Sequence, residues 1–69
     1  MFNVLNRRVK IFKAIEEAVK QNPGIPYDKA VALTEINLGL SKKRAREYIE
    51  TLLTAEKIVF KEGRLYPVE

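Results

Sequence analysis

The stretch LGLSKKRAREYIETLL, residues 38–53, contains a turn, a helix start and a long amphipathic pattern. Gly39 can adopt the left-handed backbone that ends a helix, and Ser41 can accept a hydrogen bond from an unpaired amide at the start of the next helix. Apolar residues then recur at helical spacing, which predicts a helix over residues 41–56. Its expected buried face consists of Ala45, Tyr48, Ile49, Leu52 and Leu53.

The segment at the start of the chain predicts a first helix. Apolar residues recur there at spacings of three and four up to Gln21, and Asn22-Pro23-Gly24 would end the helix. We expect it to begin near Asn3 or Asn6, because an amide side chain can cap a helix start. The expected apolar stripe consists of Ile11, Phe12, Ala14, Ile15, Ala18 and Val19.

A second helix is expected at about Tyr27–Asn37, after a short extended piece at Ile25 and a helix-starting proline at Pro26. This segment is apolar on nearly all sides, which is typical of a helix buried between neighbours. Lys29 and Glu35 would then mark the part of it that remains exposed.

The residues after Lys57 predict a β-hairpin. Two runs rich in β-branched and aromatic residues, 58–61 and 64–66, flank the two-residue turn Glu62-Gly63. Pro67 would end the second strand or lie at the sheet edge, because proline cannot donate to a sheet.

Length and composition limit what the protein can be. A chain of 69 residues forms one domain, since it buries only about 60% of its unfolded surface. We therefore assign residues 1–69 to a single domain, in which we expect residues 1–5 to be extended or mobile. Apolar residues make up 46% of the chain and charged residues 32%, which is a globular composition.

Several functional classes are disfavoured by the residues that the sequence lacks. It contains no Cys and no His, which removes the usual metal ligands, the usual general base and thiol nucleophiles. We therefore expect no enzyme activity, no metal and no cofactor. No apolar run is long enough for a membrane span and the start does not resemble a signal peptide, so we expect a cytoplasmic protein with no membrane partner.

The net charge of +4 has a local origin. Lys42, Lys43, Arg44 and Arg46 supply four cations, and the remaining nine Lys and Arg equal the nine Asp and Glu. The positive end of the helix dipole disfavours cations at a helix start, so the cluster is easiest to explain if an anion binds there. Against this, Glu47 and Glu50 are spaced to neutralise Lys43 and Arg46, which would make an ordinary solvated face.

The order of helix, extended piece, helix, glycine turn, helix and hairpin resembles the winged helix-turn-helix family, of a small archaeal or archaeal-virus type. The residues that carry the resemblance are the turn 38–41, the apolar residues Ala45, Ile49 and Leu52, and the closing IVFKEGRLY at 58–66. One position departs from the pattern. The family has a small residue four positions before the turn glycine, and Glu35 stands there, which implies a helix one residue out of phase or a longer turn.

The resemblance implies an α+β fold with three helices and a C-terminal β-hairpin, the wing. It further implies a double-stranded DNA-binding protein, acting as a small transcriptional regulator, with helix 41–56 in the major groove and hairpin 58–66 on the flanking backbone. The DNA-binding residues carried over are Ser41, Lys42, Lys43, Arg44, Arg46, Glu47, Lys61 and Arg64. Arg7 and Arg8 could contact a phosphate or merely flank the first helix.

Two alternatives remain open from the sequence. Winged helices also serve as protein–protein docking modules, and the acids on the third helix, the short wing and the apolar second helix fit that role. We also expect a homodimer, because Phe2, Val4 and Leu5 exceed what one small core needs.

Abundant Lys, Glu and Arg with no Cys and one Met are typical of thermophile proteins.

Overall fold

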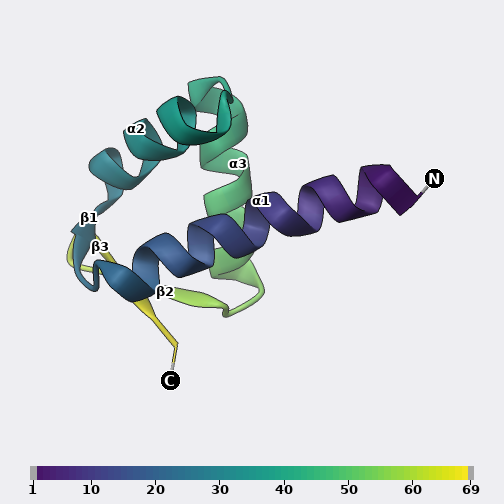
Figure 1. The fold of residues 1–69 in the computed structure, drawn as a ribbon. Coiled ribbons are helices and arrows are strands. Elements are labelled where there is room, and N and C mark those ends of the chain that lie inside the picture. The colour runs from purple at the N-terminus through teal and green to yellow at the C-terminus, as the bar shows by residue number, and fades with distance from the viewer. Residues whose placement is uncertain (1, 69) are drawn as a thin grey trace.

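Three helices and a small antiparallel sheet make up the described part of the chain (Figure 1). The structure is a computed structural model that describes the backbone of residues 2–68 and the side chains of residues 7–68. The helices are α1 (Phe2–Gln21), α2 (Tyr27–Leu38) and α3 (Lys42–Thr54), and the strands are β1 (Ile25–Pro26), β2 (Ile58–Lys61) and β3 (Arg64–Pro67). The expected α+β fold of three helices and a C-terminal hairpin is confirmed, and the arrangement is compatible with a winged helix.

The sheet has the order β1-β3-β2, so the last strand of the chain lies in its middle. The hairpin strands pair from Lys61↔Arg64 next to the turn to Ile58↔Pro67 at the far end. On the other side of β3, Ile25 pairs with Leu65 in the short strand β1. Pro67 therefore ends the second strand, as its missing N–H predicts.

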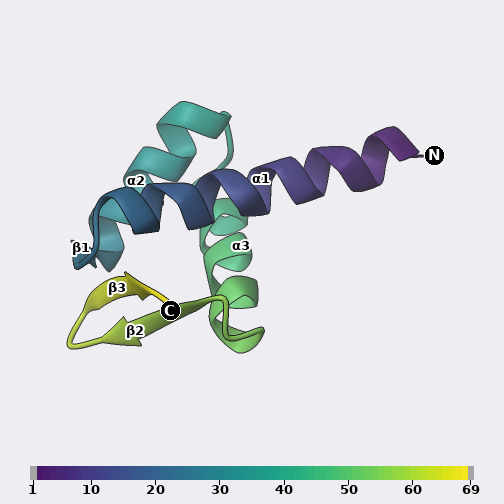
Figure 2. The same ribbon diagram turned by 60° about the horizontal axis from the view of Figure 1, so that its bottom comes forward.

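The hydrophobic core lies between the three helices and the sheet, with buried residues from each helix and each strand. Figure 2 shows the hairpin below α1 and beside the C-terminal end of α3. Ile49 of α3 and Leu65 of β3 are fully buried, and the rings of Phe12 and Tyr48 meet edge to face with centroids 4.8 Å apart. The predicted buried face of α3 is confirmed at four positions, Ala45, Tyr48, Ile49 and Leu52, while Leu53 is only partly buried.

The turn between α2 and α3 has the predicted form. Gly39 ends α2 in the left-handed region, with φ 65°. The Ser41 hydroxyl oxygen accepts a hydrogen bond from the backbone N–H of Arg44 at 3.2 Å, which caps the start of α3. The predicted helix over residues 41–56 is slightly too long at both ends, because Ser41 is the cap and the last helical residue is Thr54.

Helix α1 begins earlier than expected. It starts at Phe2, so Asn3 and Asn6 lie inside the helix, and residues 2–5 are helical where an extended or mobile segment was expected. A helix that is already packed over its C-terminal half grows at its free end at little cost, which explains the extra turns. Two residues of the expected apolar stripe, Ile15 and Val19, are buried. Ala14 and Ala18 are exposed and line an open depression between α1 and α2.

Helix α2 is less buried than its composition predicts. Its buried residues are Ala30, Val31 and Thr34, and Ile36 is 75% exposed, so a helix enclosed on all sides was a wrong expectation. The exposed side of α2 carries Asp28, Lys29, Ala32, Ile36 and Asn37, so Ile36 is a large apolar side chain in a mixed exposed face. Thr34, one position before Glu35, is buried, and its hydroxyl donates to the Ala30 carbonyl at 2.8 Å.

The helices also bear on membrane insertion. Within residues 2–68, none of them combines the length and the apolarity that crossing a bilayer requires.

Candidate nucleic-acid interface

The exposed face of α3 carries the cationic cluster. Ala45 and Ile49 are fully buried, which turns the opposite side of the helix outward. The side chains predicted to contact DNA on this helix are all exposed: Ser41, Lys42, Lys43, Arg44, Arg46 and Glu47. The Ser41 hydroxyl uses an acceptor site for the helix cap, so its hydrogen remains able to donate to an anion.

The cations lie on the two sides of α3 and on the outer strip between them, and Arg46 is shared between the strip and the α2 side. Lys42 and Arg46 line a shallow depression on the α2 side, next to Tyr27 and Glu35. Arg44 lies on the opposite side, facing α1. The outermost strip between them includes Lys43 and Glu47. A polyanion bound along α3 would therefore meet positive charge on both sides of the helix.

Glu50 has a partner that the sequence did not indicate. Its carboxylate accepts a hydrogen bond from the Tyr27 hydroxyl, with the two oxygens 3.0 Å apart. Burial raises the pKa of Tyr27, and the nearby Glu50 raises it further, while a hydrogen bond from Arg46 opposes the rise. Tyr27 therefore stays protonated at neutral pH and donates to Glu50. This hydrogen bond holds the Glu50 carboxylate on the side of α3 that faces α2.

Tyr27 also links this site to the hairpin, through its ring and its backbone N–H. The Tyr27 ring meets the ring of Phe60 edge to face, with centroids 5.8 Å apart. Its backbone N–H donates to the Gly63 carbonyl in the hairpin turn at 2.9 Å. The start of α2, the face of α3 and the hairpin turn are thus joined through one residue.

The hairpin is short and is tied to the rest of the fold at its turn. Glu62 and Gly63 both have positive φ, 52° and 76°, which is typical of a tight two-residue turn. Arg64 donates from its Nη1 to the Gly24 carbonyl at 2.8 Å, so its side chain is engaged within the domain. Lys61 is exposed beside the turn. Of the two predicted wing residues, Lys61 is therefore the more available for DNA.

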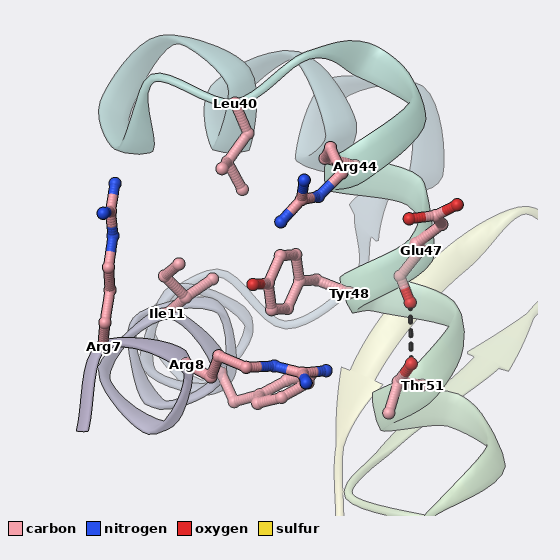
Figure 3. Close-up of a pocket in the computed structure, with 9 residues that line it drawn as sticks. Arg7, Arg8, Ile11, Leu40, Arg44, Glu47, Tyr48 and Thr51 are labelled. Carbon is pink, nitrogen blue, oxygen red and sulfur yellow. Dashed lines mark hydrogen bonds between the residues drawn. The ribbon is translucent and has the colours of Figure 1, made fainter. Parts of the chain in front are cut away.

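A second basic region lies on the α1 side of α3. We call it the arginine hollow, and define it by the cations on its rim, Arg7 and Arg8 from α1 and Arg44 from α3. Figure 3 shows Arg44 projecting into the space between the two helices, above the ring of Tyr48. The apolar floor consists of Ile11, Phe12, Leu40 and Tyr48.

Little in the sequence indicates this hollow. Arg7 and Arg8 lie far from Arg44 along the chain, and no spacing rule connects them. Their proximity depends on the angle at which α1 crosses α3. The pair of adjacent arginines near the start of a helix is the one local signal, and it fits both a phosphate contact and a flanking role.

In the side chains of residues 7–68, no group of three or more acidic, His or Cys residues is arranged to hold a metal ion. The chain matches no protein-family model, no curated protein and no solved structure. Its function must be inferred from its own charge and geometry.

Proposed function

We propose that this protein binds double-stranded DNA by placing the exposed face of α3 in the major groove, as a small transcriptional regulator. One observation carries the proposal: Lys42, Lys43, Arg44 and Arg46 are all exposed at the start of α3, where the helix dipole opposes them. An arriving phosphate backbone would offset this repulsion.

Each side chain has a role that fits its position. Lys43 and Arg46 on the outer part of α3 would contact base edges, where an Arg fork suits guanine O6 and N7. Lys42 and Arg44 on the two sides of the helix would contact phosphates, with Ser41 as an added hydroxyl donor. Glu47 would accept a hydrogen bond from a cytosine amino group. These roles are part of the proposal.

The hairpin would contact the backbone beside the groove. Lys61 is the wing residue best placed for this, because it is exposed next to the turn. Arg64 would act chiefly by holding the hairpin against the Gly24 carbonyl. The wing contribution to affinity would accordingly be about one phosphate contact.

Titration of a labelled duplex tests the proposal. With about four to six phosphate contacts, the logarithm of affinity should fall with the logarithm of salt concentration at a slope of about −4 to −5. We expect Lys43→Ala/Arg46→Ala, which removes the two proposed base contacts, to weaken binding. The control Lys13→Ala/Lys20→Ala removes the same charge from exposed positions of α1 and should have a smaller effect.

Negligible binding by wild type and by Lys43→Ala/Arg46→Ala, both at low salt, would contradict the proposal. In that case the alternative is a protein–protein docking module. The observation that favours this alternative is the outer face of α2, where Ile36 is 75% exposed. An exposed Ile36 contributes nothing to DNA binding in our proposal, so Ile36→Lys should leave the affinity for DNA undiminished.

A further inference from the structure

The arginine hollow is a positively charged surface outside the face of α3 that we assign to the major groove. Arg7, Arg8 and Arg44 line it together with the single acid Glu47. The hollow is open, with a volume of about 700 Å³, and all three arginines are exposed. Three like charges against one acid repel each other, so an anion bound between them would lower the energy of the arrangement.

The chemistry of the rim favours phosphate. All three cations are Arg, and a guanidinium can donate two parallel hydrogen bonds to the oxygens of one phosphate. The donors come from two different helices and surround the same space, as Figure 3 shows for Arg7, Arg8 and Arg44. An anion in the hollow could therefore be contacted from α1 and α3 at once.

The position of the hollow favours a long polyanion over a small one. Glu47 and Thr51 line both the hollow and the outer strip of α3, so the two surfaces are continuous. Figures 1 and 2 place the N-terminal part of α1 and the hairpin on opposite sides of α3. A duplex whose groove receives α3 would thus have one backbone near the hairpin and the other near the arginine hollow.

We propose that the arginine hollow binds the phosphate backbone of DNA on the α1 side of the groove. The inference rests on the proposed function and adds α1 as a third DNA-contacting element, beside α3 and the hairpin. Arg7 and Arg8 act on phosphates and not on bases, so they raise affinity for all sequences alike. Arg44 is shared between the hollow and the cationic face of α3.

The test compares Arg7→Ala/Arg8→Ala with the wild type and with the Lys13→Ala/Lys20→Ala control, using the same labelled duplex across a range of salt concentrations. Loss of one or two phosphate contacts should reduce the magnitude of the salt slope by about 1 to 2. The control removes the same charge from the same helix on a face away from the hollow, and should change the slope by less. Arg7→Lys/Arg8→Lys keeps the charge and should retain most of the slope.

The outcomes separate the two proposals. If Arg7→Ala/Arg8→Ala has the wild-type slope while Lys43→Ala/Arg46→Ala weakens binding, the hollow does not contact DNA and the function of α3 stands. If the wild type does not bind the duplex, both proposals are wrong. A labelled glutamate-rich peptide is the second probe: binding that depends on Arg7 and Arg8, with DNA binding unaffected, would assign the hollow to an acidic protein segment instead. Far-UV circular dichroism checks that each variant is folded.

Discussion

Ile49 and Ile36 show that the contribution of a residue to stability depends on its position in this small domain. Ile49 on α3 is fully buried among α1, the hairpin and its own helix, whereas Ile36 on α2 is 75% exposed. Both lie at apolar positions of predicted helices, and the sequence favoured burial for both segments. The difference arises because α3 is covered by the rest of the fold and the outer face of α2 is not.

We predict that Ile49→Ala costs about 2–5 kcal/mol, because it removes buried contacts and leaves a cavity. That is a large share of the roughly 3–10 kcal/mol expected for a domain of this size. The matched variant Ile36→Ala should change stability by less than about 0.5 kcal/mol. Urea denaturation followed by circular dichroism measures both, and equal losses in the two variants would contradict the burial assigned here.

Tyr27 predicts a dependence of stability on pH. Burial and the Glu50 carboxylate raise the pKa of its hydroxyl in the folded state. The folded chain therefore holds this proton more tightly than the unfolded chain does. The resulting stability is present below about pH 10, the usual tyrosine pKa, and is lost as the pH rises through the higher folded value.

Tyr27→Phe keeps the ring and removes the titrating group. As the pH rises from neutral to above about 10, the variant should therefore lose less stability than the wild type. Denaturation midpoints measured across this range test the prediction. Ultraviolet titration should also show that the variant lacks a tyrosine transition above the usual value. Identical pH profiles for the two proteins would contradict a raised pKa of the Tyr27 hydroxyl in the folded state.

At the scale of elements, the turn from α2 to α3 depends on local chemistry. Gly39 supplies the left-handed backbone and Ser41 supplies the cap, and these two roles are separated by only one residue. A Cβ at position 39 would meet no atom within 4 Å, so glycine is needed there for its backbone conformation and not for space. The hairpin shows the opposite case, because its turn is held by contacts from Gly24 and Tyr27, which lie far away in the chain.

We expect Ser41→Ala to destabilise the domain by about 1 kcal/mol, because the N–H of Arg44 loses its cap. For a domain of this length, this corresponds to a decrease of about 4–8 °C in melting temperature. Ser41→Asp should retain stability, since a carboxylate also caps a helix start and interacts favourably with the dipole. A melting temperature that is unchanged in Ser41→Ala would contradict the assigned cap.

At the scale of the whole molecule, α1 projects beyond the rest of the domain and gives it an elongated outline, 38 Å in its longest dimension (Figure 1). The backbone of this projection is helical from Phe2 onward. Phe2, Val4 and Leu5 lie outside the residues whose side chains the structure describes. Their apolar character nevertheless remains the basis for proposing self-association through this end of the chain.

We predict a homodimer that depends on these residues. Sedimentation at high micromolar concentration should give the mass of two chains for the wild type and of one chain for Phe2→Ser/Leu5→Ser. A wild type that is strictly monomeric under these conditions would remove the prediction. The DNA-binding proposal does not depend on the result, although a dimer would double the contacts that each duplex receives.

The sequence by itself determined the elements of this protein. The three helices, the glycine turn, the Ser41 cap, the hairpin and most of the buried face of α3 followed from patterns that span only a few residues. Such features depend on backbone preferences and on periodicity, which are local properties of the chain. The cationic side of α3 could be predicted in the same way, because a helix fixes the direction of each side chain once one buried face is known.

Only the tertiary structure decided which distant residues meet. It brought β1 beside β3, the Tyr27 hydroxyl to Glu50, Arg64 to the Gly24 carbonyl, and Arg7 and Arg8 to the side of Arg44. It also left the outer face of α2 in solvent, against the expectation from its composition. These features depend on the angles at which the helices and the sheet pack. Those angles result from packing the apolar faces of several elements against one another at the same time, and no local pattern contains them.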